Sequence, residues 1–176
     1  VTLYDFTIAS ENNIDIKNLR LHATSTGLIS GEGFNDFKVW DVEKGAIVTN
    51  AVDHTTSTDQ TFTDVISLNS GQSRRFKVTA DIDADNDDGD SIQVSLLAFQ
   101  ASDIKNLDNN TYVAAADTVP NATLNGNTLT VRVPSLDVQL GGLSSQTYVQ
   151  GSTNKALLSV NLRGVADKIA VKTLIF

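Results

Sequence analysis

The chain has 176 residues and a formal charge of 13 − 21 = −8 at pH 7. This length fits one well-cored domain with a partial second unit, and excludes a large multidomain enzyme. The negative surface repels phosphate backbones and anionic lipid, so nucleic acid is not expected as a partner. There is no Cys, which excludes disulfides and thiolate metal sites.

Two further features concern processing and membranes. No apolar run approaches the roughly 20 residues that cross a bilayer, so we expect no membrane insertion. The sequence begins at Val1 and contains no Met. This fits either a mature chain after signal removal or a segment of a longer polypeptide.

Apolar residues recur at every second position along the chain, beginning with Tyr4, Phe6 and Ile8, whereas sustained helical periodicity does not appear. We therefore predict an all-β fold, an antiparallel Ig-like or jelly-roll β-sandwich. The longer stretches 24–36 and 43–61 are predicted as loops with room for a short helix. Further strands are expected at 37–42, 62–68, 76–82, 92–96, 112–115, 129–133, 136–140 and 156–162.

An internal repeat links the two ends of the chain. Its two copies share apolar steps of two, three and two residues at an offset of 169 − 14 = 155. The step of three indicates a shared β-bulge. Upstream, Tyr4 and Phe6 correspond to Val160 and Leu162. The matched positions are Ile14, Ile16, Leu19 and Leu21 against Ile169, Val171, Leu174 and Phe176.

The repeat predicts that residues 1–135 form a sandwich beginning at its second strand, and that 136–176 supply the opening strands of another copy. Such an incomplete sandwich exposes unpaired backbone groups and an apolar slot, which a strand from a neighbouring subunit or repeat would complete. Head-to-tail contacts of this kind generate filaments. The alternative is a tandem array whose neighbouring repeats supply the strands in cis. The predicted interface residues are Tyr4, Phe6, Ile8, Leu158, Val160, Leu162, Ile169, Val171, Leu174 and Phe176.

Two runs of turn and strand residues carry a family resemblance. The first contains SGQS, FKVTAD and GDSIQV within 70–94, and the second contains GSTN and LSVNL within 151–162. Together they resemble the β-sandwich repeats of large surface proteins from candidate-phylum bacteria. There is a looser architectural likeness to the donor-strand-exchanging TasA-type fibre proteins. The resemblance implies an extracellular, cell-surface location and a scaffolding role.

An acidic loop is the best candidate metal site, because it places six carboxylates within ten residues. Ca²⁺ takes six to eight oxygen ligands, so calcium is a possible cofactor. The loop is not an EF-hand, since counting from Asp83 puts Asp88 where the glycine belongs. A solvated loop whose charges prevent edge aggregation is the alternative. The carboxylates are Asp81, Asp83, Asp85, Asp87, Asp88 and Asp90.

The sequence offers one formal catalytic match, S-x-x-K at Ser152 and Lys155, but that motif works on a helix and here it precedes a predicted strand. Only two histidines occur, His22 and His54, and there is no G-x-S-x-G, H-E-x-x-H or P-loop pattern. We predict no enzyme and no small-molecule substrate, but a structural subunit of an extracellular filament or surface layer. This pilus-like homopolymer or S-layer component has one alternative, a surface adhesin that binds glycan or protein within a longer tandem-repeat protein. Trp40 and Tyr148 would form its sugar-stacking platform unless they are core aromatics.

Overall fold

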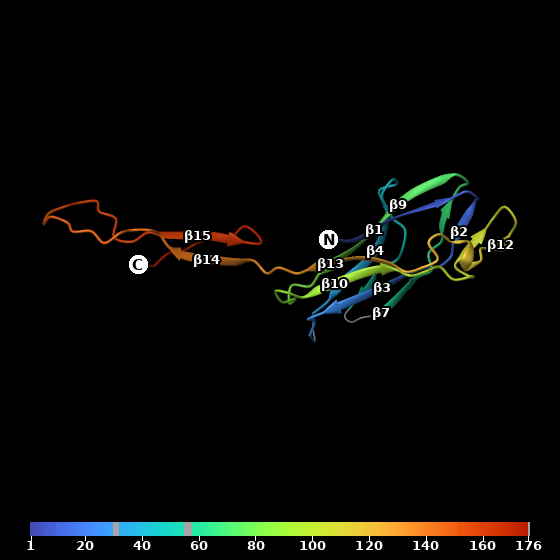
Figure 1. Cartoon of the computed structure of the whole chain (residues 1–176), viewed down its shortest axis with the longest axis horizontal. Helices are drawn as coiled ribbons and strands as arrows, with labels where there is room; N and C mark the ends of the chain where they lie inside the picture. The colour runs from blue at the N-terminus through green and yellow to red at the C-terminus, as the bar shows by residue number, and fades with distance from the viewer. Residues whose placement is uncertain (30–31, 55–57, 176) are drawn as a thin grey trace. The chain divides into compact units, whose positions relative to one another are not determined.

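A computed structural model describes residues 1–29, 32–54 and 58–175 of the protein. Over these ranges the fold is all-β and every strand pairing is antiparallel, with one 3-10 turn, η1 (Ala115–Asp117) (Figure 1). None of these residues belongs to a helix that is long and apolar enough to span a membrane.

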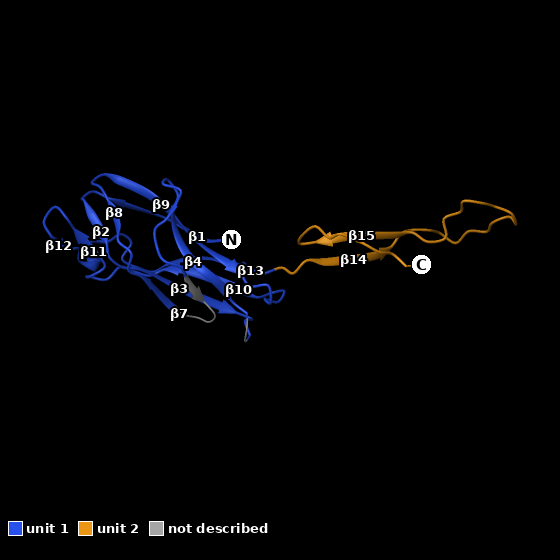
Figure 2. Cartoon of the chain, turned by 180° about the vertical axis from the view of Figure 1, so that it is seen from behind, with its two compact units in different colours: residues 1–131 blue, residues 132–176 orange. Residues whose placement is uncertain are grey.

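The chain divides into two compact units, Val1–Val131 and Arg132–Phe176 (Figure 2). The division falls directly after the last strand of the first unit, β13, which ends at Thr130. It lies four residues before the boundary that the repeat predicted at 135, since 135 − 131 = 4.

The first sheet of unit 1 begins with β1 at one edge and continues through β9 and β4 to β5, while β6 also pairs with β4. The strands span β1 (Thr2–Ser10), β9 (Gln72–Ile82), β4 (Phe34–Asp41), β5 (Ala46–Ile47) and β6 (Val52–His54).

Two further sheets complete unit 1. The second sheet has the order β13-β10-β3-β7, and the third has the order β12-β11-β2-β8. Layered antiparallel sheets of this kind confirm the predicted β-sandwich. The strands are β13 (Leu124–Thr130), β10 (Ser91–Leu96), β3 (Leu19–Thr26), β7 (Thr58–Phe62), β12 (Thr111–Tyr112), β11 (Ile104–Asn106), β2 (Ile14–Ile16) and β8 (Ile66–Leu68).

The core lies within unit 1. One contiguous cluster of buried apolar side chains contains residues of all three of its sheets. The alternating strands supply it, because every second side chain of a half-buried strand points to the same face. Its largest fully buried members include Phe34, Phe37, Phe76, Ile16, Leu19 and Leu21.

The apolar step of three in the repeat marks a change of sheet. Ile16 ends β2 in the third sheet and Leu19 begins β3 in the second. Between them, the N–H groups of Lys17 and Asn18 both donate to the carbonyl of Asp103, at 2.6 and 3.3 Å. Two residues facing one is the arrangement of a β-bulge. Here the bulge turns the chain from one sheet into the next and keeps Ile16 and Leu19 on the core side.

Some strand boundaries differ from those predicted. The expected strand 62–68 is interrupted at 63–65, because the chain passes there from β7 in the second sheet to β8 in the third. At this crossing the carboxylate of Asp64 accepts the backbone N–H of Asn50 at 2.8 Å. The stretches predicted as loops contain short strands instead, namely β5, β6 and β7. Their residues 30–31 and 55–57 lie outside the described part of the chain.

Unit 2 is a two-stranded antiparallel hairpin of β14 (Ser135–Leu140) and β15 (Val160–Val165). Leu140 lies opposite Val160, and Ser135 lies opposite Val165. The predicted strand 156–162 therefore begins later, at Val160. The segments 141–159 and 166–175 contain no further strand. Three predicted interface residues, Ile169, Val171 and Leu174, thus lie outside strands, and Phe176 lies outside the described residues.

Candidate functional site

The open edge of β1 is the candidate site. Within the part of the chain that the structure describes, β1 pairs with β9 alone and ends the first sheet. On the far side of β9, the N–H of Val42 donates to the carbonyl of Arg75 at 3.0 Å, so this carbonyl points toward β4. Arg75 lies opposite Thr7. Because hydrogen-bonding direction alternates along a strand, the backbone groups of Thr7, Asp5 and Ala9 point to the open edge.

The even-numbered side chains of β1, which are Tyr4, Phe6 and Ile8, face the interior of the sandwich. Two hollows of about 500 and 550 Å³ run along β1, and both include Thr7 and Leu124. We call these two hollows together the edge groove. Its apolar floor comes from the first and second sheets. β1 contributes Tyr4, Phe6 and Ile8, and β13 contributes Leu124, Gly126 and Leu129.

Tyr4 joins the two strands that border the edge groove. Its hydroxyl donates to the carbonyl of Leu124 at 3.1 Å, and its burial raises the pKa of the phenol. The ring lies against Gly126, where an added Cβ would be 2.6 Å from the ring and 2.4 Å from the carbonyl oxygen of Val94. Glycine is therefore required at this position, so that β13 can approach the ring closely.

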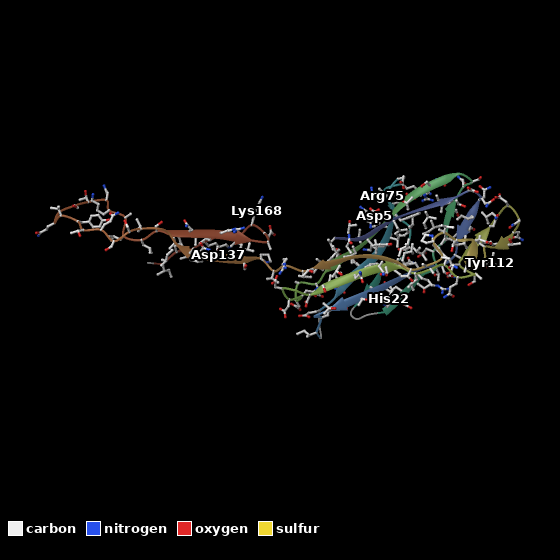
Figure 3. All side chains as sticks on the ribbon, in the orientation of Figure 1. Asp5, His22, Arg75, Tyr112, Asp137 and Lys168 are labelled. Atoms are coloured by element: carbon white, nitrogen blue, oxygen red, sulfur yellow. The ribbon has the colours of Figure 1, made fainter. Side chains whose placement is uncertain are left out.

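The outer face of the same edge carries an ion pair. Arg75 donates three hydrogen bonds to the carboxylate of Asp5, at 2.8, 2.9 and 2.6 Å, and both side chains lie exposed next to each other (Figure 3). The carboxylate of Glu43 also accepts the backbone N–H of Arg75 at 2.9 Å. The cation beside β1 is thus already balanced by carboxylates of its own unit.

The predicted interface residues fall into two groups. Phe6 is buried, and Tyr4 and Ile8 are half-buried, in the floor of the edge groove. Val160 and Leu162 lie in β15, and Leu158 just precedes it. The structure brings the β1 residues together, and it places the others in the separate hairpin unit.

Sequence reasoning missed three candidate residues on β14. Leu136, Val138 and Leu140 alternate along this strand and are 40, 58 and 81% exposed. Their alternation was visible in the predicted strand 136–140. What the sequence lacked was the pairing of β14 with β15, which gives these side chains their register.

The acidic loop is held by turn hydrogen bonds. The buried carboxylate of Asp90 accepts the N–H of Asp87 at 2.7 Å, and Asp83 accepts the N–H of Asp85 at 3.2 Å and the amide of Asn35 at 3.1 Å. Asp81 lies on β9, and Asp85, Asp87 and Asp88 are exposed. In the described ranges, no three acidic or histidine side chains converge as a metal site. Calcium binding stays a prediction, which melting temperatures in Ca²⁺ and in chelator would test.

Two other candidates have local partners. The indole N–H of Trp40 donates to the Thr79 hydroxyl at 2.9 Å, while the Tyr148 hydroxyl donates to the Gln146 side chain at 2.7 Å. Trp40 belongs to unit 1 and Tyr148 to unit 2. His22, predicted at a strand end, lies in the middle of β3, where its ring contacts the Asp59 carboxylate of the paired strand β7.

Comparison with known proteins adds no relative. No protein-family model matches the chain, and neither a curated protein nor a solved structure is detectably similar to it.

Proposed function

We propose that this protein is a structural subunit of an extracellular filament or surface layer, in which subunits join head-to-tail by β-strand complementation. The observation that carries the proposal is the open edge of β1. There, outward-pointing backbone groups lie directly beside a groove whose floor holds the apolar side chains of both β1 and β13. Unpaired ladder groups with an adjacent apolar slot accept an extended strand, because hydrogen bonds provide affinity and pockets for alternate side chains provide specificity.

Unit 2 supplies a suitable donor. Its large apolar side chains are mostly exposed, and they include Leu136, Val138 and Leu140 on β14. An isolated two-stranded hairpin is marginally stable in water. Burying these side chains against another copy would remove apolar surface from water, which favours association. Acceptor and donor therefore lie in different units of one chain, as head-to-tail growth requires.

Electron microscopy of the purified full chain and of a 1–131 truncation tests the proposal. The truncation keeps the whole core cluster of the described residues, so it is expected to fold. We expect the full chain to form filaments and the truncation to stay monomeric. Adding the truncation to the full chain should shorten the filaments, because it can accept a strand but has none to donate.

Two results would contradict strand complementation by unit 2. One is a full chain that stays monomeric by sedimentation at concentrations where surface proteins assemble. The other is a truncation that forms the same filaments as the full chain. A folded truncation, verified by circular dichroism, is the control that gives either result its meaning.

The repeat also favours a second candidate, an adhesin or scaffold module in a tandem array. In that case the preceding repeat would supply the missing strand in cis, and glycan or protein binding would reside on the loops. The length of the polypeptide in its source distinguishes the two. A gene product several repeats long supports the array, and a product of about this length supports the self-assembling subunit.

A further inference from the structure

The structure of the hairpin extends the sequence repeat by one strand. Tyr4 and Phe6 of β1 correspond to Val160 and Leu162 of β15, at an offset of 160 − 4 = 156. β15 is therefore the counterpart of β1. In unit 2 this counterpart has a partner, β14, that precedes it in the chain. Among the described residues of unit 1, no strand occupies the equivalent position beside β1.

The backbone directions of the two counterpart strands agree. The N–H of Gly141 donates to the carbonyl of Ser159 at 2.7 Å, so odd-numbered residues of β15 direct their backbone groups toward β14. At the offset of 156, Asn161 and Arg163 correspond to Asp5 and Thr7. These β1 residues also direct their backbone groups to the open edge. The edge of β15 that β14 occupies is thus the edge that β1 leaves open.

Transferring the hairpin register onto β1 gives a specific pairing. Leu140 lies opposite Val160 and Val138 lies opposite Leu162. On β1, these two donor residues would face Tyr4 and Phe6, and Leu136 would face Ile8. Side chains directly opposite each other lie on the same face of a sheet. All three apolar side chains of β14 would therefore enter the edge groove, and Asp137 would lie outside, opposite Thr7.

The charges agree with this register. Asp137 faces Thr7, and Gln139 faces Asp5, so no like charges lie opposite each other. A slip of two residues that placed Asp137 opposite Asp5 would bring two carboxylates together, which is destabilising. A slip of one residue would turn the apolar side chains of β14 out of the groove.

The alternation of backbone directions also shows whether β14 must leave β15 before it pairs with β1, or could pair with β1 through its other edge. Odd-numbered residues of β14 point their backbone groups to β15, so the opposite edge of β14 carries the even-numbered ones. If β14 kept β15 and added its other edge to β1, Val138 would lie opposite Thr7. Its side chain would then leave the interior. Only release of β14 from β15 places the apolar side chains in the groove.

Resting on the proposed function, we infer that β14 of one copy leaves β15 and pairs antiparallel with β1 of a second copy, with Val138 opposite Phe6 and Asp137 opposite Thr7. The ladder of β14 is lost in cis and regained in trans. The net gain is the burial of three exposed apolar side chains in the edge groove. In this exchange, β14 leaves β15 and pairs with its sequence counterpart, β1, in another copy.

Cysteine pairs in two separate chains test this register, since the protein has no Cys of its own. T7C mixed with D137C would form a hydrogen-bonded pair with Cα atoms about 5.5 Å apart, within the range for a disulfide. T7C mixed with V138C is the matched control, because it reports addition without exchange. After mild oxidation, we expect T7C mixed with D137C to form a covalent mixed dimer, and T7C mixed with V138C to form none. Peptide mass spectrometry identifies the linked positions.

Electron microscopy of each variant and of the unmodified chain separates this inference from the proposed function. Filaments without the T7C–D137C crosslink, or with the V138C crosslink instead, overturn the exchange register and leave the filament function in place. The D137C crosslink in a protein that forms only dimers supports the register and overturns the filament function. If neither a crosslink nor filaments form, both the exchange register and the filament function are overturned.

Discussion

At the scale of single residues, the buried ion pair of Arg74 and Asp41 makes the sharpest stability prediction. Both side chains are buried, Arg74 also donates to the carbonyl of Ser67 at 2.7 Å, and burial lowers the pKa of its guanidinium. R74M would leave the carboxylate of Asp41 buried without its cation. We expect it to lower the free energy of unfolding by about 3–5 kcal/mol.

Urea denaturation of R74M and R75M measures the difference. Arg75 is the matched control, because it is the next residue and its pair with Asp5 is exposed. An exposed pair contributes at most about 1 kcal/mol. If R74M and R75M lowered the free energy of unfolding equally, the buried pair of Arg74 and Asp41 would contribute no more to stability than the exposed pair of Arg75 and Asp5.

Asp15 predicts how stability depends on pH. Hydrogen bonds from Lys17 at 2.8 Å and from the Ser67 hydroxyl at 2.6 Å lower the pKa of this carboxyl in the folded protein. A pKa below the unfolded value of about 3.9 stabilises the fold above that pH, and this contribution is lost as the pH falls through the folded value. The unfolding free energy of the unmodified chain should therefore fall more steeply in acid than that of D15N. A pH-independent difference between the two would contradict this assignment.

At the scale of elements, the passage from β2 to β3 depends on Asp103. Its fully buried carboxylate accepts hydrogen bonds from Asn18 at 3.0 Å, Arg20 at 2.8 Å and the N–H of Gln100 at 2.7 Å. D103A would remove all three and leave Arg20 without its carboxylate. We expect D103A to lower the free energy of unfolding by about 3 kcal/mol.

Hydrogen exchange gives this prediction a local readout. The amides of Lys17 and Asn18 donate to the Asp103 carbonyl, so in D103A they should exchange faster than the amides of β9. D108A is a matched control, since Asp108 caps the exposed turn at Asn13 and lies outside this passage. Unchanged exchange at Lys17 in D103A would mean that the side chain does not hold the passage.

The same passage shows what could be predicted from the sequence. Alternation at Tyr4, Phe6 and Ile8 indicated a half-buried strand, and the structure places all three against the core. The step after Ile16 was visible too. That this step marks a change of sheet could not be predicted, because the change depends on Asp103, which is 85 residues from Asn18 in the chain. Sheet order in general depends on such distant pairings, which local periodicity does not encode.

The candidate site was predictable to a similar depth. The repeat predicted that a strand is missing beside β1, because the pattern of β1 recurs near the other end of the chain. It did not identify β14 as that partner, since β14 has no sequence counterpart in unit 1. Only the hairpin register, with Leu140 opposite Val160, showed which residues of β14 would face which residues of β1.

At the scale of the whole molecule, an open β1 edge predicts an alternating pattern of hydrogen exchange. In the monomer, the amides of Phe6 and Ile8 point to β9 and should be protected, whereas those of Thr7 and Ala9 point to the open edge and should exchange rapidly. In the assembled state, pairing in trans should protect Thr7 and Ala9 as well. Exchange followed by residue-resolved NMR in the monomer, and after dissolution of the assembly, measures both states.

The pattern distinguishes an open edge from a loosely held strand. A strand that frays as a unit would lose protection at all four positions together, because exchange then follows opening of the whole strand. An edge strand that is held on one side keeps every second amide. Uniform protection along β1 in the monomer would show that its edge is already covered within the chain, and no second copy would then be needed to complete the sandwich.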